Sequence, residues 1–140
     1  MYTWQTTITL RDADAAGVLF FARYLALAHD AYEAFLTAHG LGTGRILREA
    51  TYLLPVVHAE SNYRHPLWVG DRVTIVLWIE HIKRRTYTIA YELRNAEQTL
   101  ACTVHTTHVA VDKTSRRAVP LPEELVHILK QAHPDEKEEK

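Results

Sequence analysis

The chain has 140 residues, which is the length of one domain and enough to bury a hydrophobic core without disulfides or metals. Its 16 basic and 17 acidic residues leave no overall field that would gather nucleic acid or an acidic membrane, so we expect neither as a partner. A lone cysteine, the absence of an apolar signal segment at the start and the absence of any long apolar run lead us to expect a cytoplasmic protein.

The first half of the chain contains one strand and one long helix. Bulky residues and threonines alternate over residues 2–10 and predict a strand. Apolar residues then recur at spacings of three and four over residues 20–38, which predicts a helix that ends at a cap formed by Gly40. The glycine-rich stretch 40–44 looks like a phosphate loop, but it follows a helix where such a loop must precede one, so we expect a flexible helix exit.

The second half is rich in β-structure. Four strands are predicted, at residues 53–63, 73–80, 86–93 and 100–111, and a short helix closes the domain after Pro120. Short turns between strands allow only antiparallel pairing, so the fold class is α+β with one helix against a five-stranded sheet. Trp78, Tyr87 and Tyr91 are expected on faces that one helix leaves uncovered, which predicts self-association. The domain is placed at residues 1–133, followed by a charged tail at 134–140.

The inventory of residues excludes several catalytic mechanisms. Only two serines are present, Ser61 and Ser115, and neither lies in a G-x-S-x-G elbow. Cys102 lies within a predicted strand without basic neighbours, which favours a buried structural cysteine. His105 and His108 are an odd number of residues apart in a strand and should point to opposite faces, so we predict no metal site.

The most informative segment is the turn before the long helix, where Asp12 and Asp14 precede Gly17. One interpretation is helix capping, for which a single aspartate suffices. The other is catalytic. Free backbone N–H groups at the start of the helix would polarise a carbonyl oxygen, while the second carboxylate attacks the carbonyl carbon or activates water. Spacing alone favours neither interpretation.

The pattern D-x-D-x-x-G-V from Asp12, with the aromatic residues and Tyr24 that follow, resembles the active-site segment of hotdog-fold acyl-CoA thioesterases of the 4-hydroxybenzoyl-CoA thioesterase type. The order of strand, long helix and four strands is also the hotdog order. Shorter matches resemble the 1,4-dihydroxy-2-naphthoyl-CoA hydrolases of phylloquinone synthesis, and they lie at residues 54–59, 70–71, 107–109 and 120–122. The resemblance implies a hotdog fold, with the sheet wrapped on the long helix.

The implied activity is hydrolysis of an aromatic acyl-CoA, most specifically 1,4-dihydroxy-2-naphthoyl-CoA. No cofactor is implied, because coenzyme A is part of the substrate. The resemblance assigns the catalytic acid, as nucleophile or general base, to Asp14. It assigns the close approach of the backbone to Gly17 and the N–H donor to the thioester oxygen to Phe21. Tyr24 matches the motif tyrosine, with packing as its other interpretation, and Asp12 is expected to be a turn or capping residue.

The resemblance also implies a homodimer or homotetramer with sites between protomers. His58 would line the pocket of the partner chain, or it is an ordinary strand histidine. Arg84 and Arg85 would hold the phosphates of coenzyme A, or they are solvated surface charges. Two alternatives stay open: a thioesterase for other aromatic or short-chain acyl-CoA, and a hotdog protein that binds acyl thioesters without cleaving them.

Overall fold

The computed structural model describes residues 1–134, so the predicted tail lies, apart from Pro134, outside the described residues. The helices are α1 (Phe21–Ala38), α2 (Thr43–Glu49) and α3 (Glu123–Lys130), with a short 3-10 turn at Leu10–Asp12. The strands are β1 (Tyr2–Thr7), β2 (Tyr52–Leu53), β3 (Val56–Tyr63), β4 (Arg72–Ile82), β5 (Thr86–Arg94), β6 (Leu100–Val109) and β7 (Val111–Asp112). No helix among the described residues has the length and hydrophobicity needed to cross a bilayer.

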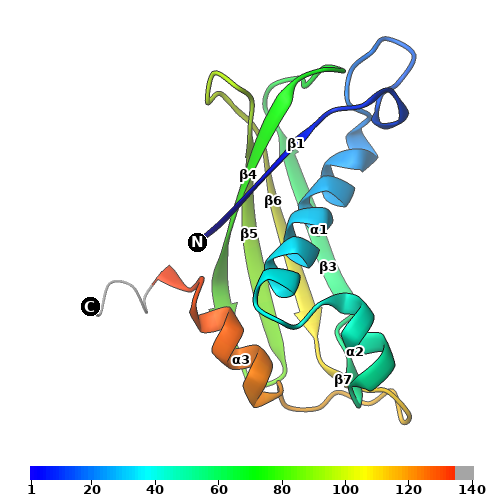
Figure 1. The fold of residues 1–140 in the computed structure, drawn as a ribbon, viewed down its shortest axis with the longest axis vertical. Helices are drawn as coiled ribbons and strands as arrows, with labels where there is room; N and C mark the ends of the chain where they lie inside the picture. The colour runs from blue at the N-terminus through cyan, green and yellow to red at the C-terminus, as the bar shows by residue number, and fades with distance from the viewer. Residues whose placement is uncertain (135–140) are drawn as a thin grey trace.

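The core forms between α1 and a five-stranded sheet whose order is β1-β4-β5-β6-β3 (Figure 1). All four neighbouring pairs are antiparallel, as the short turns predicted. The predicted helical spacing is confirmed, because one stripe of α1 is buried: Tyr24, Leu27, Ala28, Ala31, Tyr32, Phe35 and Leu36. The α+β class and the long helix are therefore as predicted, although two short helices accompany it.

Two details of the β-rich half differ from prediction. Residues 53–63 do not form one strand, because Pro55 lacks an N–H donor and separates β2, which pairs with β7, from β3. Residues 43–49 form the helix α2 and not a flexible exit. Gly40 does adopt the left-handed conformation of a helix cap, with a φ of 82°.

Tyr87 and Tyr91 were wrongly placed on an uncovered face. Both are fully buried, and the hydroxyl of Tyr87 lies 2.5 Å from that of Tyr32 on α1. They belong to the face of β5 that packs under the helix, whereas Trp78 is partly exposed. Alternation separates the two faces of a strand but does not say which one a helix covers, and that is the reason for the error.

A histidine lies within this core. His108 is fully buried, and its Nε2 atom lies 3.0 Å from the hydroxyl of Thr106. Its ring stacks on that of Tyr87 at 4.9 Å between centroids. Burial lowers the pKa of His108 to about 4, so the ring is neutral at pH 7. As predicted, His105 points to the opposite face, where it lies 3.4 Å from Glu80.

Candidate active site

Asp12 fixes the loop that precedes α1. Its buried carboxylate accepts hydrogen bonds from the hydroxyl of Thr9 at 2.9 Å and from the guanidinium of Arg23 at 2.8 Å. Burial opposes ionisation of Asp12, but the bonds from Thr9 and Arg23 outweigh it and hold the pKa of the carboxyl below its ordinary value. Its backbone carbonyl accepts the N–H of Phe20 at 3.0 Å. These contacts give Asp12 the predicted turn role, in the capping box of the 3-10 turn Leu10–Asp12, whereas its side chain does not cap α1.

Asp14, two residues later, lies in a different environment. Its side chain is exposed, and Oδ1 accepts the backbone N–H groups of Ala16 at 2.8 Å and Val18 at 3.3 Å. Within residues 1–134, Oδ2 accepts no hydrogen bond. The carboxylate is thus oriented through one oxygen while the other is free to meet a ligand. Of the two aspartates, one is built into the fold and the other is presented to solvent.

Gly17 allows the chain to turn back toward the helix. Its φ is 82°, in the left-handed region that residues with a side chain seldom adopt. Its carbonyl accepts the N–H of Val69 at 3.0 Å, which ties the loop to the segment before β4. A β-carbon here would meet no atom within 4 Å, so the requirement for glycine comes from the backbone conformation and not from crowding.

The start of α1 carries free backbone donors. Phe20 occupies the N-cap position and cannot accept a hydrogen bond through its side chain. The N–H groups of Phe21 and Ala22 have no acceptor among the described residues, whereas that of Arg23 bonds to the carbonyl of Phe20 at 2.8 Å. Two adjacent donors at the positive end of a helix dipole form a site for a partly negative oxygen.

A cleft of about 310 Å³ opens beside these donors. The residues that line it come from the loop, the first turns of α1 and the end of β3: Val18, Leu19, Phe21, Tyr24, Tyr63, Arg64, His65 and Pro66. Asp14 adjoins the cleft through Val18, because its backbone N–H bonds to the carbonyl of Val18 at 2.9 Å. The volume is within the range of small-molecule pockets, and the wall is mainly apolar with basic groups at Arg64 and His65.

Tyr24 forms part of the wall from α1. It is buried, which raises the pKa of its hydroxyl, and its ring meets that of Tyr63 edge-on at 5.0 Å. The side chain therefore packs against the core while one part of it faces the cleft. Both predicted interpretations, packing and contact with a ligand, are compatible with this position.

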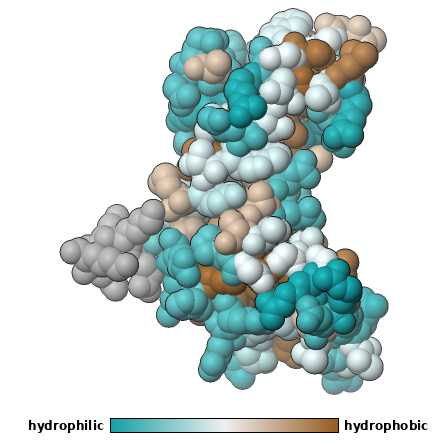
Figure 2. All heavy atoms as spheres, viewed as in Figure 1, coloured by the Kyte–Doolittle hydropathy of each residue, from teal (hydrophilic) through white to brown (hydrophobic). Residues whose placement is uncertain are grey.

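The same end of the molecule exposes hydrophobic side chains. Figure 2 shows brown residues gathered where the loop meets the start of α1. The large exposed side chains of this region are Leu10, Phe20, Phe21, Trp68 and Val69. Apolar surface beside a polar carboxylate is suited to a ligand that has both an aromatic part and a reactive carbonyl.

The other predicted binding residues lie elsewhere in the protomer. His58 is on β3, five positions before Tyr63, and its exposed ring pairs with Glu60 at 3.1 Å. Arg84 and Arg85 form the turn between β4 and β5, at the end of the sheet opposite the start of α1 (Figure 1). The eleven residues of β4, at about 3.3 Å per residue, separate that turn from the cleft. One chain therefore brings together Asp14, Gly17, Phe21 and Tyr24 but not these three.

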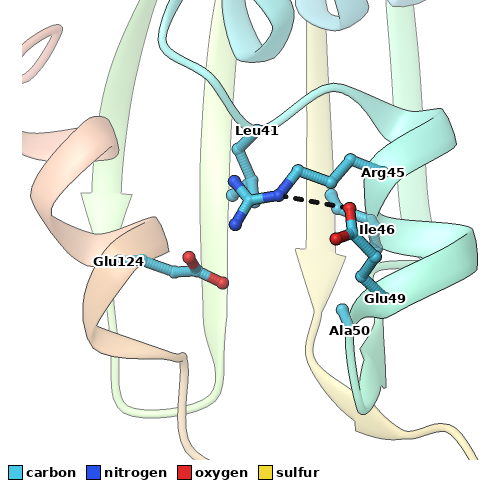
Figure 3. A pocket seen from close by; sticks show the side chains of 6 residues that line it. All are labelled: Leu41, Arg45, Ile46, Glu49, Ala50 and Glu124. Atoms are coloured by element: carbon cyan, nitrogen blue, oxygen red, sulfur yellow. Dashed lines mark ion pairs between the residues drawn. The ribbon is translucent and has the colours of Figure 1, made fainter.

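The cavity between α2 and α3 and the lone cysteine are poorly suited to a substrate. A cavity of about 70 Å³ lies between α2 and α3, where Arg45 pairs with Glu49 at 3.5 Å and faces Glu124 (Figure 3). It is less than half of the roughly 150 Å³ that holds a benzene-sized ligand. Cys102 is buried as predicted, and burial raises the pKa of its thiol to about 11, which disfavours the thiolate that a nucleophile requires. No group of three metal-binding side chains comes together within residues 1–134.

Sequence reasoning missed two parts of this site. Tyr63 and His65 were not singled out, because only tertiary packing brings them beside α1. Tyr63, for example, bonds to Phe21, which is 42 positions away in the sequence. Arg64 was noted only as one basic residue among several. The available signal was the end of a predicted strand at Pro66, where side chains leave the sheet near its edge.

Comparisons with known proteins agree with this arrangement. Residues 8–129 match the family model of the thioesterase-like superfamily. A 1,4-dihydroxy-2-naphthoyl-CoA hydrolase from Rippkaea orientalis is 38% identical over 93% of this chain and 96% of its own, and one from Synechococcus elongatus is 37% identical over 89% and 91%. The crystal structure of a 1,4-dihydroxy-2-naphthoyl-CoA thioesterase from Synechocystis aligns with a TM-score of 0.87 and 30% identity over 91% and 94%. The predicted hotdog-type fold and thioester hydrolase family are confirmed, and the chain belongs to the thioesterase-like superfamily.

Proposed function

We propose that this protein hydrolyses the thioester bond of an aromatic acyl-CoA, most specifically 1,4-dihydroxy-2-naphthoyl-CoA. The observation that carries the proposal is the free carboxylate oxygen of Asp14, which is bonded to the cleft residue Val18, together with the unpaired N–H groups of Phe21 and Ala22 where α1 meets the same cleft. The substrate itself is inferred from similarity to hydrolases named for that compound.

The chemistry requires few groups. The N–H of Phe21 would donate to the thioester oxygen and stabilise the negative charge that develops there. Asp14 would then either attack the carbonyl carbon, forming an anhydride that water cleaves, or remove a proton from the attacking water. In both routes the bond from carbon to sulfur breaks, the thiolate of coenzyme A leaves, and water supplies the oxygen of the acid product.

The apolar wall supports the aromatic part of the proposal. Phe21, Tyr24 and Tyr63 present rings to the cleft, and ring contacts stabilise an aromatic acyl group more than a short aliphatic one. Arg64 and His65 stand at the same cleft and are the basic residues that one chain offers to the phosphates of coenzyme A.

A second copy of the chain would complete the site. The outer edge of β3 pairs with no strand among the described residues, and seven of its eight residues are exposed. An antiparallel pairing of two β3 strands centred between Glu60 and Ser61 would bring His58 of the second copy opposite Tyr63. Arg84 and Arg85 would likewise have to reach coenzyme A from another chain, because they lie far from the cleft of their own.

The test is release of free thiol from a series of substrates: 1,4-dihydroxy-2-naphthoyl-CoA, 4-hydroxybenzoyl-CoA, benzoyl-CoA and hexanoyl-CoA. We expect the bicyclic aromatic substrate to give the highest kcat/KM. Equal or faster turnover of hexanoyl-CoA would contradict the aromatic assignment. Binding without any release of thiol would favour the non-hydrolytic alternative.

Asp14→Asn tests the mechanism. The amide oxygen can still accept the N–H groups of Ala16 and Val18, so we expect the loop to hold while kcat falls by a factor of roughly 10² to 10⁴. Asp30→Asn is the matched control, since Asp30 is an exposed carboxylate of α1 and should leave the rate unchanged. A normal rate in Asp14→Asn would refute the proposed role of this carboxylate.

A further inference from the structure

We propose that Tyr63 is the positioning residue of the oxyanion donor. Its hydroxyl donates a hydrogen bond of 3.0 Å to the backbone carbonyl of Phe21, the residue whose N–H faces the substrate oxygen in the proposed mechanism. The role rests on the proposed function, because it concerns the same donor. Tyr63 itself need not touch the reacting atoms.

The start of α1 needs such support because it has no side-chain cap. Phe20 at the N-cap accepts nothing through its side chain, so the first turn lacks the bond that normally fixes it. On one side, the carbonyl of Asp12 holds the N–H of Phe20 at 3.0 Å. On the other side, the bond from Tyr63 is the one side-chain hydrogen bond that joins β3 to α1 within residues 1–134.

Tyr63 is itself held firmly. Its backbone is opposite Cys102 in the antiparallel pair of β3 and β6, and its ring packs edge-on against that of Tyr24 at 5.0 Å. The hydroxyl thus holds the first peptide group of the helix in a fixed position relative to the sheet. Rigid support of this kind matters because small displacements of a donor cost large factors in rate.

The hydrogen bond also acts on the neighbouring donor. The carbonyl of Phe21 belongs to the same peptide group as the N–H of Ala22, which has no acceptor among the described residues. A bond to the carbonyl polarises this peptide group and makes its N–H a stronger donor. Tyr63 therefore acts on both N–H groups at the start of α1, by position for Phe21 and by polarisation for Ala22.

Tyr63→Phe tests the role, because it keeps the ring against Tyr24 and removes only the hydroxyl. We expect kcat toward the best acyl-CoA to fall on the order of 10-fold with KM little changed. In spectra of the ¹⁵N-labelled free protein, we expect the amide signals of Phe21 and Ala22 to shift.

Tyr52→Phe is the matched control. It removes a hydroxyl that donates to Glu124 at 2.9 Å, far from the cleft, and it should leave kcat and both amide signals unchanged.

The two readouts separate the outcomes. Unchanged amide signals in Tyr63→Phe overturn the proposal whatever the activity. A raised KM with unchanged kcat also overturns it, because Tyr63 would then only contact the substrate. If the unaltered protein cleaves none of the thioesters, the proposed function fails, and the amide signals still decide whether Tyr63 holds the start of α1.

Discussion

Two aspartates of one short motif lie in opposite surroundings. Asp12 is buried and is bound by Thr9 and Arg23, so its charge is used within the fold. Asp14 is exposed and keeps one carboxylate oxygen without a partner among residues 1–134. The spacing of the motif left capping and catalysis equally open. The hydrogen bonds place the first carboxylate within the 3-10 turn and leave the second available for the proposed chemistry.

His108 makes the stability of the protein depend on pH. Burial lowers the pKa of its ring from 6.5 to about 4. Between these pH values, His108 is protonated in the unfolded chain and neutral in the folded one. The full free energy of unfolding is present above pH 6.5, where the ring is neutral in both states, and it falls as the pH drops toward 4. The slope is at most about 1.4 kcal/mol per pH unit, or roughly 3 kcal/mol across this range.

Urea unfolding of the unaltered protein and of His108→Gln between pH 7 and 4 measures this contribution. The glutamine variant should be less stable at pH 7, because it loses the stacking on Tyr87. Its stability should also decline less steeply with acid, so the two curves converge near pH 4. Parallel curves would show that the ring of His108 is protonated as easily in the fold as in the unfolded chain.

At the scale of elements, the start of α1 depends on a contact between the loop and the helix. The substitution Asp12→Asn replaces the carboxylate that binds Thr9 and Arg23 with a neutral amide. Because Arg23 is 39% exposed, we expect a loss of only about 1–2 kcal/mol in the free energy of unfolding at pH 7. The pKa of Asp12 is lowered in the fold, so its charge stabilises the protein above pH 3.8, and that contribution is lost at lower pH.

Urea unfolding at pH 7 and pH 3 checks the prediction for Asp12→Asn. The difference in stability from the unaltered protein should be present at pH 7 and shrink at pH 3. The rate of thioester cleavage should fall less than in Asp14→Asn, since the backbone bond from Phe20 to Asp12 remains. An equally large loss of rate would assign Asp12 a direct part in the reaction.

The elements that could be predicted from sequence are those with a local cause. Alternation in β4 and the three-and-four spacing in α1 reflect burial of one face, which each segment shows by itself. The helix α2 has seven residues, too few for a clear periodicity, and it begins among glycines. The contact of Tyr63 with Phe21 joins residues 42 positions apart and has no local signature. The motif therefore located Asp14 and Gly17, but the opposite wall of the cleft required the structure.

For the whole molecule, the open edge of β3 is the strongest indication of assembly. The unpaired N–H and C=O groups of a strand edge, with exposed valines beside them, can pair with a strand of another chain. Val57 is 60% exposed on this edge, and a charge there would be buried if two β3 strands paired. This indication replaces the earlier expectation based on Tyr87 and Tyr91, which lie in the core.

Light scattering coupled to gel filtration tests the assembly. We expect the unaltered protein to elute as at least twice the chain mass of 16.1 kDa and Val57→Asp to approach the mass of one chain, with thioesterase activity falling in parallel. Leu47→Asp places the same charge on α2, at a side chain that is 62% exposed, and should leave the mass unchanged. A Val57→Asp protein of undiminished mass would place the interface elsewhere.

The missing cap at the start of α1 links the proposed activity to the stability of this chain. A serine or aspartate at the N-cap would satisfy the amides that Phe20 leaves free, and such caps typically add about 1 kcal/mol to stability. The same cap would occupy the two N–H donors that the proposed mechanism reserves for the substrate oxygen, and we expect it to inhibit thioester cleavage. The absence of a side-chain cap is thus what leaves the amides of this helix end free to bind a ligand.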